Sequence, residues 1–307
     1  MYLVTGGAGF IGSHIVERLV RQGKKVRIID DLSSGLLANL KGFGHKVQFI
    51  KGDIRDARAV ARAMRGVKYV IHEAALKSVP ESILRPRQFH DVNVNGTFNL
   101  LLAAKDAGVR RFVFASSSSV YGDAASLPVR ESFPVQPISP YGATKVMGEI
   151  YCRNFHQVFG LPTAVVRYFN VFGPRQDPKS PYAGVIPKFI KALKNNQRPT
   201  IFGNGLQSRD FTYIDNVVDG TLKALTAPIP PSVPAINIAN GNPYSVLAMA
   251  KLLNKIMGKD VKPLFKPPRK GDILHSYADI TLARKYLKYK STVSFAQGLG
   301  KTVSYFI

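Results

Sequence analysis

Short apolar runs alternate with amphipathic stretches along the first 170 residues of the chain. The runs are four to six residues long and rich in β-branched or aromatic side chains, which is typical of strands buried on both faces of a sheet. We predict strands at Tyr2–Thr5, Val26–Asp30, Val47–Ile50, Tyr69–His72, Arg111–Ser116 and Thr163–Tyr168, with Ile236–Ala239 as one further candidate. Helical spacing of the apolar positions predicts helices at Ser13–Gln22, Asp56–Met64, Val92–Ala107 and Ala143–Phe159.

This alternation predicts an α/β fold, with a Rossmann-type doubly wound parallel sheet that helices cover on both faces. We assign residues 1–170 and about 212–241 to this sheet domain. The remainder, about 171–211 and 242–307, is predicted to form a smaller α/β lobe that binds the substrate. Proline-rich segments in the second half of the chain predict loops, and helical spacing recurs there in two places. The loops are Pro174–Pro181, Ala227–Pro234 and Lys262–Gly271, and the helices are Pro187–Asn195 and Val246–Met257.

The composition narrows the class of protein. Hydrophobic residues make up 45% of the 307 positions, enough for a large core, which excludes a disordered segment, a collagen and a disulfide scaffold. Lys and Arg number 43 against 19 Asp and Glu, so the formal net charge is +24. The basic residues are spread along the chain without a recognisable nucleic-acid motif. We therefore interpret them as a basic surface and expect no dedicated nucleic-acid binding.

Three absences in the sequence bear on location and cofactors. The one cysteine, Cys152, has no partner for an internal disulfide, which favours a reducing cytoplasm. No stretch approaches ~18 uninterrupted apolar residues, and the N-terminus lacks a basic region, so neither a membrane span nor a signal peptide is expected. No cluster of His and Cys has metal-ligand spacing, so we expect no metal.

A glycine-rich segment, TGGAGFIG, lies between the first predicted strand and the first predicted helix. Gly6 permits a tight turn, Gly9 lets the backbone approach a pyrophosphate, and Gly12 allows the helix to pack closely on the strand. The free N–H groups at the start of the helix would bind the phosphates. An ordinary turn is the alternative, but the strand before the segment and the helix after it favour a dinucleotide site.

Acidic residues follow the second and third predicted strands. Asp30 lies about 20 residues beyond the glycines, where a carboxylate binds the adenosine ribose and repels a 2′-phosphate, which favours NAD over NADP. Asp31 strengthens this argument unless one of the two residues only starts a turn. Asp53 and Ile54 follow the third strand and are candidates for the adenine edge, with helix capping as the alternative for Asp53.

A tyrosine and a lysine indicate acid–base chemistry. Tyr141 and Lys145 are four residues apart and share one helical face. An ammonium beside a phenol lowers the phenol pKa from about 10 and makes it a usable base. A serine run, Ser116–Ser119, ends the fifth predicted strand, and ligands bind at such strand ends. Chance spacing and loop filler are the alternatives for these two features.

The segments TGGAGFIG, SSSSVYG and SPYGATK, in this order, resemble the motifs of extended short-chain dehydrogenases/reductases. The similarity covers nearly the whole chain through IHEAALKSVPES, NVNGTFN, RYFNVFGPRQDP, SRDFTYIDN and RKGDILHSYADI. The chain is most similar to NAD-dependent nucleotide-sugar 4-epimerases, and HSYADI with GPRQDP resembles UDP-N-acetylglucosamine 4-epimerases. Dehydratases of the family carry Asp-Glu where this chain has Ser118 and Ser119, which favours epimerisation over the elimination of water.

The resemblance implies NAD-dependent 4-epimerisation of a UDP-hexose through a transient 4-keto intermediate. Tyr141 is expected to take the proton of the sugar 4-OH while C4 gives a hydride to NAD⁺. Ser117 is expected to hydrogen-bond the same oxygen, and Lys145 to bind the nicotinamide ribose and lower the pKa of Tyr141. The keto sugar then turns over and takes the hydride back on its other face, so NAD is regenerated.

The resemblance also assigns contact residues. Ser276 falls where some UDP-galactose 4-epimerases have a bulky Tyr, which implies room for an N-acetyl group. Arg209 matches a phosphate or ribose contact, with an ion pair to Asp210 as the alternative. Together with the residues above, the expected cofactor contacts are Gly6, Gly9, Phe10, Ile11, Gly12, Asp30, Asp31, Asp53, Ile54, Ala74, Lys77, Asn93, Tyr141, Lys145 and Tyr168. The expected substrate contacts are Lys77, Ser117, Ser118, Tyr141, Asn170, Phe202, Arg209, Arg269, Asp272 and Ser276.

Several points stay open at this level. Asp31 and Glu73 depart from the family pattern, and neither is expected to touch the chemistry. The helices predicted at 92–107 and 143–159 match those of a dimer interface, which predicts a homodimer unless their apolar residues all face the sheet. The alternative functions are another NAD-dependent UDP-sugar conversion, such as UDP-glucuronate 4-epimerisation or a reductase step, and a non-catalytic NAD-binding module.

Overall fold

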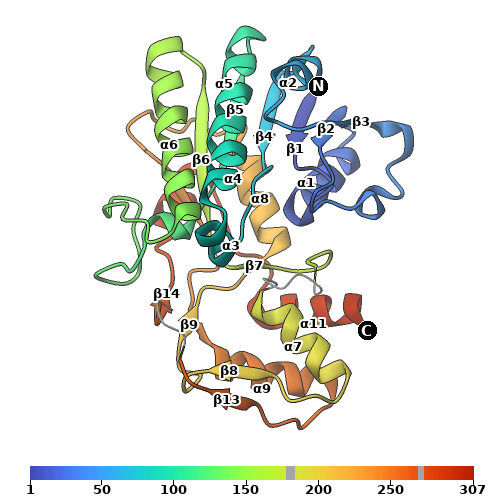
Figure 1. Cartoon of the computed structure of the whole chain (residues 1–307), viewed down its shortest axis with the longest axis vertical. Coiled ribbons are helices and arrows are strands. Elements are labelled where there is room, and N and C mark those ends of the chain that lie inside the picture. Colours follow the sequence, from blue (N-terminus) through green and yellow to red (C-terminus); the bar gives the residue numbers. More distant parts are fainter. Residues whose placement is uncertain (178–183, 269–272) are drawn as a thin grey trace.

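The computed structural model describes residues 1–177, 184–268 and 273–307, and Figure 1 shows the course of the chain. Its largest element is a sheet of seven strands in the order β11-β6-β5-β4-β1-β2-β3, and every neighbouring pair is parallel. The strands are β1 Tyr2–Thr5, β2 Val26–Asp30, β3 Val47–Lys51, β4 Tyr69–His72, β5 Arg111–Ser117, β6 Thr163–Tyr168 and β11 Ile236–Ile238. The predicted α/β fold is confirmed, and every predicted strand is present with its ends within one residue.

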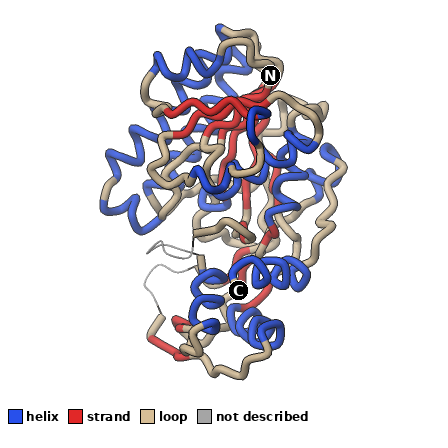
Figure 2. The backbone as a smooth tube through the Cα atoms, turned by 90° about the vertical axis from the view of Figure 1, so that its right-hand side faces the viewer, coloured by secondary structure: helices blue, strands red, loops and turns tan. Residues whose placement is uncertain are grey.

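Helices cover both faces of this sheet, as Figure 2 shows. Successive side chains of a strand point to opposite faces, so Leu3 joins one core and Val4 the other. The first core includes side chains of α2 (Ala57–Met64), α5 (Gly96–Asp106) and α6 (Pro140–Phe159). The second includes side chains of α1 (Phe10–Arg21) and α8 (Ile214–Ala224). Burial on both faces explains why the strands are continuous apolar runs.

The order of the strands fixes where a ligand can bind. β2 and β3 extend the sheet on one side of β1, whereas β4, β5 and β6 extend it on the other. The crossovers after β1 and β4 therefore leave in opposite directions, and a crevice opens between the carboxyl ends of these two strands. The glycine-rich segment follows β1, and residues 73–77 follow β4, so both lie at this switch point.

The helices depart from the predicted bounds at several places. α6 begins at Pro140 rather than at residue 143, because the Ser139 side chain caps it and proline is favoured in the first turn. The predicted helix at 92–107 begins with a π-helical turn, Asp91–Asn95, before α5. The pattern did not indicate α3 (Val79–Leu84), α4 (Pro86–His90), α8, α10 (Thr281–Leu287) or α11 (Phe295–Phe306).

The second half forms most of a smaller layer below the sheet in Figure 1. It contains α7 (Val185–Lys194), α9 (Val246–Met257) and short strands that include β8 (Thr200–Phe202) and β13 (Leu264–Lys266). β13 corrects the predicted loop at 262–271: it pairs in parallel with β8, but all three of its side chains are exposed, so no apolar pattern marks it. In the described part of the chain no helix is long and apolar enough to cross a membrane.

Two further sheets join the layers. β7 (Val171–Phe172), which follows β6, pairs in parallel with β10 (Thr212–Tyr213), which precedes α8. β9 (Ser208–Arg209) lies between β12 (Tyr244–Ser245) and β14 (His275–Ser276). These short strands bring segments that are far apart in the sequence next to the carboxyl end of the large sheet.

Candidate active site

The glycine loop has the geometry that a dinucleotide requires. Gly6 has a φ of +66°, and its carbonyl accepts a hydrogen bond from the Gly9 N–H at 3.0 Å. A Cβ on Gly12 would lie 2.2 Å from the Gly6 oxygen, and one on Gly6 would lie 2.8 Å from the Ala74 backbone. α1 starts at Phe10 with no side chain capping it, so its first N–H groups remain available to an anion. The loop therefore fits a pyrophosphate.

Asp30 ends β2 beside this loop. Its carboxylate accepts hydrogen bonds from the N–H groups of Ala8 and Leu32, each at 2.9 Å. These bonds fix the carboxylate next to the glycine loop and leave lone pairs for two ribose hydroxyls. Burial raises the pKa of Asp30, whereas the two backbone hydrogen bonds lower it. Asp31 is exposed and accepts hydrogen bonds from the N–H and hydroxyl of Ser33, so it is the residue that starts a turn.

The two residues after β3 have different environments. Asp53 is not a helix cap, because Asp56 accepts the first N–H groups of α2. Asp53 instead accepts hydrogen bonds from the backbone and guanidinium of Arg55, whose side chain lowers the Asp53 pKa. Ile54 is 5% exposed and packs against Gly96. The structure therefore puts the Ile54 side chain in the core.

The structure brings the three predicted catalytic side chains together at the carboxyl end of β5. Ser117 is the last residue of β5, its hydroxyl lies 3.2 Å from the Ser119 hydroxyl, and its polar interaction with Tyr141 acts to lower the Tyr141 pKa. Tyr141 lies in the first turn of α6, and Lys145 lies one turn further along the same helix. The Lys145 Nζ donates to the Ala115 carbonyl at 2.8 Å and lies 5.9 Å from the centre of the Tyr141 ring. Ser118, which is half-buried, begins the 3₁₀ turn after β5.

The electrostatics of this group differ from the expectation. Burial raises the pKa of Tyr141, and the polar interaction with Ser117 offsets this only in part. Burial also lowers the pKa of Lys145 to about 8, against the attraction of Glu73 and Glu149. The expected fall in the Tyr141 pKa is therefore absent in the protein alone, because loss of solvation outweighs the neighbouring groups.

The segment after β4 is held from both sides. The Ala74 N–H donates to the Thr5 hydroxyl at 3.1 Å. The Asn93 amide accepts from the Leu76 N–H at 2.8 Å and donates to the Leu76 carbonyl at 2.9 Å. Asn93 lies in the π-helical turn, and such turns are frequent at functional sites. It therefore fixes the backbone that carries Lys77, whose side chain is exposed.

Glu73 corrects one expectation, because it touches a predicted cofactor residue. Its carboxylate accepts a hydrogen bond from the Tyr168 hydroxyl at 2.7 Å, and its charge interacts with Lys145 and Tyr141. The same Tyr168 hydroxyl lies 2.7 Å from the Thr221 hydroxyl of α8. A polar residue after the apolar strand YVIH was the available signal, but its neighbours on β6 and α8 are remote in sequence.

A buried ion pair beneath the site was also missed. Glu149, one turn beyond Lys145 on α6, accepts two hydrogen bonds from Arg167 of β6, at 2.9 and 2.6 Å. Glu149 also accepts the Ser116 hydroxyl at 2.5 Å. Arg167 donates further to the Tyr121 hydroxyl at 2.8 Å. The available signal was an arginine inside the apolar strand TAVVRY, which needs a buried partner.

The predicted substrate residues come from several short elements. Asn170 follows β6 with a φ of +32°, and its carbonyl accepts the Thr212 N–H at 3.3 Å. Phe202 ends β8 and is half-buried. Arg269 and Asp272 lie outside the described residues.

Arg209 and Ser276 are partners in the short three-stranded sheet. The register of β9 and β14 pairs the two residues directly. The Arg209 guanidinium donates to the carbonyls of Ser208 and Leu274 at 2.9 and 3.2 Å. Asp210 is fully buried, and its carboxylate accepts the N–H groups of three other residues rather than Arg209. The alternative of an Arg209–Asp210 ion pair therefore does not hold.

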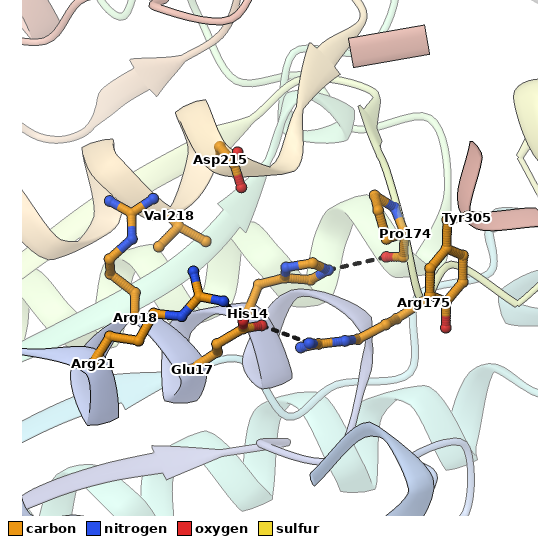
Figure 3. Close-up of a pocket in the computed structure, with 9 residues that line it drawn as sticks. All are labelled: His14, Glu17, Arg18, Arg21, Pro174, Arg175, Asp215, Val218 and Tyr305. Atoms are coloured by element: carbon orange, nitrogen blue, oxygen red, sulfur yellow. Dashed lines mark hydrogen bonds and ion pairs between the residues drawn. The ribbon is translucent and has the colours of Figure 1, made fainter. Parts of the chain in front are cut away.

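A separate cavity of about 240 Å³ lies between α1, α8 and the C-terminal helix, as Figure 3 shows. Its lining contains none of the predicted site residues that the structure describes. His14 is 3.0 Å from the Pro174 carbonyl, and Arg175 donates to Glu17 at 2.5 Å. These contacts hold α1 against the segment after β7. Within the described ranges, no three His, Cys, Asp or Glu side chains are placed to bind a metal ion together.

Known proteins match this chain over nearly its full length. The sequence profile of the NAD dependent epimerase/dehydratase family matches residues 2–239. The UDP-glucose 4-epimerase of Mycolicibacterium smegmatis is 40% identical, over 99% of this chain and 97% of its own length. The crystal structure of UDP-glucose 4-epimerase from Thermotoga maritima with UDP-glucose has a TM-score of 0.94 and 38% identity, over 99% of this chain and 98% of that one.

A structure of UDP-N-acetylglucosamine 4-epimerase from Methanobrevibacter ruminantium, in complex with UDP-N-acetylmuramic acid, is similar to the same degree. Its TM-score is 0.95 at 39% identity, over 99% of this chain and 97% of that one. The resemblance seen in the motifs is thus confirmed by sequence and by structure. The chain belongs to the NAD-dependent epimerase/dehydratase family of extended short-chain dehydrogenases/reductases, and NAD is its cofactor.

Proposed function

We propose that this enzyme interconverts the 4-epimers of a UDP-hexose, with UDP-GlcNAc/UDP-GalNAc, UDP-Glc/UDP-Gal or both as its substrates. The observation that carries the proposal is the convergence of Ser117, Tyr141 and Lys145 at the carboxyl end of β5, at the same edge of the sheet as the glycine loop, which follows β1 two strands away. Residues 1–170 and about 212–241 then form the NAD-binding domain. The substrate-binding lobe consists of about 171–211 and 242–307.

The chain's own residues can move one proton at the sugar. The Tyr141 phenolate accepts the proton of the 4-OH, and the Ser117 hydroxyl donates a hydrogen bond to the oxygen as it becomes a carbonyl. Bound NAD⁺ supplies the hydride acceptor for C4 and a positive charge that favours the phenolate. Lys145 stays fixed to the Ala115 carbonyl and stabilises the phenolate through its charge. Ser118 and Ser119 supply no carboxylate for a second acid–base step, which supports epimerisation rather than dehydration.

The substitution Tyr141→Phe tests this assignment. Loss of the hydroxyl should lower turnover by about 10²–10⁴-fold, the usual contribution of a general base. NAD should remain bound, because the phenyl ring keeps the packing of α6. Unchanged turnover would remove Tyr141 from the mechanism, and loss of NAD together with turnover would leave the assignment unsupported.

Ser276 supports activity on N-acetylated sugars. It is half-buried in β14 and directly paired with Arg209, which we assign to the diphosphate or ribose of UDP. A short side chain at this position leaves space for a 2-acetamido group. Ser276→Tyr should therefore reduce turnover of UDP-GlcNAc by roughly tenfold or more relative to UDP-glucose, which is the order of discrimination that a change in pocket size gives. Ser276→Ala is the matched control and should leave the ratio unchanged. Equal ratios in both variants would contradict the proposal.

We also propose that the enzyme is a homodimer. Met147, Ile150 and Val158 follow one another along α6 and are 39%, 55% and 62% exposed, so these apolar residues do not face the sheet. Ile150→Glu should convert a dimer to a monomer in sedimentation velocity at micromolar concentration. Leu206→Glu is the control, because Leu206 is equally exposed but lies in the smaller lobe. A wild-type monomer would refute this part.

A further inference from the structure

Glu73 is an acidic residue directly after β4, at the switch point of the sheet, and the mechanism above does not use it. Its backbone N–H donates to the Thr5 carbonyl at 3.3 Å, which ties it to β1 next to the glycine loop. Its side chain is half-buried, and one carboxylate oxygen lies 2.7 Å from the Tyr168 hydroxyl. Tyr168 is the residue that we assign to the cofactor from β6.

Three short contacts connect Glu73 to α8. After the contact between Glu73 and Tyr168, the hydroxyls of Tyr168 and Thr221 lie 2.7 Å apart. The Thr221 hydroxyl then lies 2.8 Å from the Val217 carbonyl of its own helix. The two hydroxyls carry one proton each, whereas three contacts need three protons if all are to be hydrogen bonds.

The protonation state of Glu73 decides how this series is satisfied. When Glu73 is ionised, Tyr168 donates to the carboxylate and Thr221 donates to Tyr168, while the Val217 carbonyl keeps its helical hydrogen bond. When Glu73 is protonated, it donates to Tyr168, Tyr168 donates to Thr221, and Thr221 donates to the Val217 carbonyl. Every group is satisfied in both states. The Glu73–Tyr168 and Tyr168–Thr221 bonds reverse direction between the two states, and the Thr221–Val217 bond forms only when Glu73 is protonated.

The charged and titratable groups around Glu73 in the described structure come from three elements. Lys145 and Tyr141 face it from α6, and the Lys145 charge favours the ionised form. Tyr168 of β6 stabilises the same form by its hydrogen bond, and His72 of β4 is buried and uncharged because burial lowers its pKa to about 3. Burial opposes the effects of Lys145 and Tyr168 and raises the pKa of Glu73 to about 7.

We propose that Glu73 is a positioning residue of the reaction, whose carboxyl takes up and releases a proton as the Tyr168–Thr221 hydroxyl chain reverses. Its ionisation places a negative charge that interacts with Lys145, the residue that the resemblance assigns to the nicotinamide ribose, so this inference rests on the proposed function. A carboxylate there favours the positively charged NAD⁺ over the neutral NADH. The affinity of the enzyme for NAD⁺ relative to NADH therefore rises as Glu73 ionises.

The test measures NAD⁺ and NADH affinity on cofactor-free enzyme by calorimetric titration from pH 5.5 to 9, with no sugar present. In the wild type the ratio of the two affinities should change by roughly tenfold as Glu73 ionises, as expected for a single charge at short range in a protein. A second change near pH 8 belongs to Lys145, whose pKa burial lowers to about 8. Glu73→Gln should abolish the first change and leave the second. A ratio that varies in the same way in wild type and Glu73→Gln would overturn the proposal.

Two further variants should move the pH midpoint of the change in affinity ratio in opposite directions. Thr221→Val removes the acceptor that Tyr168 needs when Glu73 is protonated, so the midpoint should fall. Tyr168→Phe removes the donor that stabilises ionised Glu73, so the midpoint should rise. The carboxyl stretching band in infrared difference spectra, absent in Glu73→Gln, follows the same proton directly. Shifts in the same direction, or none, would overturn the proposal.

These readouts separate the proposal from the proposed function. If the affinity ratio behaves as described but no UDP-sugar is epimerised, the role of Glu73 stands and the substrate assignment fails. If epimerisation occurs but the affinity ratio does not respond to Glu73→Gln, the role of Glu73 fails alone. If Glu73→Gln does not fold, the opposite shifts of the two hydroxyl variants and the infrared titration of the wild type decide.

Discussion

Breaking the buried ion pair beneath the site should destabilise the protein strongly. The side chains of Arg167 and Glu149 are 3% and 4% exposed, so neither charge can regain water if its partner is removed. Burial alone would lower the pKa of Arg167, but the hydrogen bonds and charge of Glu149 raise it above its ordinary value. Arg167→Met leaves the Glu149 carboxylate with only the Ser116 hydroxyl, and removal of one partner of a buried pair costs about 3–5 kcal/mol.

Replacing both partners should cost much less than replacing one. In Glu149→Leu/Arg167→Met no charge stays buried, and the remaining loss is the hydrogen bonds to Ser116 and Tyr121, about 1 kcal/mol each. The double variant should therefore be more stable than Arg167→Met alone by about 1–3 kcal/mol, which defines a coupling that single substitutions cannot show.

Urea unfolding followed by circular dichroism measures these differences, with the slope of each transition checked for constancy. Arg55→Met is the matched control, because the Arg55–Asp53 pair is 45% and 29% exposed and should be worth no more than about 1 kcal/mol. The reasoning is refuted if the double variant loses the sum of the two single losses, or if Arg167→Met costs no more than Arg55→Met.

Three other predictions follow from the site and its surroundings. Gly12→Ala should abolish NAD binding or folding, because the new Cβ would lie 2.2 Å from the Gly6 oxygen, whereas Gly300→Ala meets no atom within 4 Å and should leave both unchanged. The stability that His72 contributes should be lost as the pH drops from about 6.5 toward 3, because unfolded His72 binds a proton that buried His72, with its pKa of about 3, does not. Buried carboxyls whose pKa is raised, such as Glu73, change stability in the opposite direction, so the check is the difference in urea-unfolding stability between wild type and His72→Asn at each pH. This difference should shrink as the pH falls; a difference that is constant with pH would contradict the prediction. Finally, kcat/KM should fall above about pH 8, because the buried Lys145, with its pKa lowered to about 8, loses the charge that stabilises the phenolate of the base. A profile flat to pH 10 would contradict this role.

The sheet was predictable because β1, β2, β4, β5 and β6 are mostly buried on both faces and are therefore nearly continuous apolar runs, whereas the edge strand β3 is only half-buried and was marked by its β-branched and aromatic residues. The glycine loop, Asp30, Tyr141 and Lys145 were predictable because their chemistry depends on local spacing. The short helix α3 was not, because proline in its first turn has the same appearance in sequence as a loop. β13 was not, because an exposed parallel edge carries no apolar pattern.

The groups that tune the site were hidden for a different reason. Glu149 lies on α6 and its partner Arg167 on β6. Glu73 directly follows β4, Tyr168 lies on β6 and Thr221 on α8. Only the fold brings the members of each group together. In the protein alone burial raises the pKa of Tyr141, which the spacing could not indicate, because it shows the nearby lysine but not how deeply both groups are buried. Burial is a property of the tertiary structure and reverses the sign of the shift.

The central claim, 4-epimerisation of a UDP-hexose, is tested most directly by product analysis. Purified enzyme is incubated separately with UDP-GlcNAc and UDP-glucose, without added NADH, and the nucleotide sugars are separated by chromatography. The account predicts a 4-epimer from at least one of the two, with no net consumption of NADH, and UDP-GalNAc from UDP-GlcNAc if the small Ser276 side chain admits the N-acetyl group. No 4-epimer from either sugar, or a product whose formation consumes NADH stoichiometrically, would contradict it.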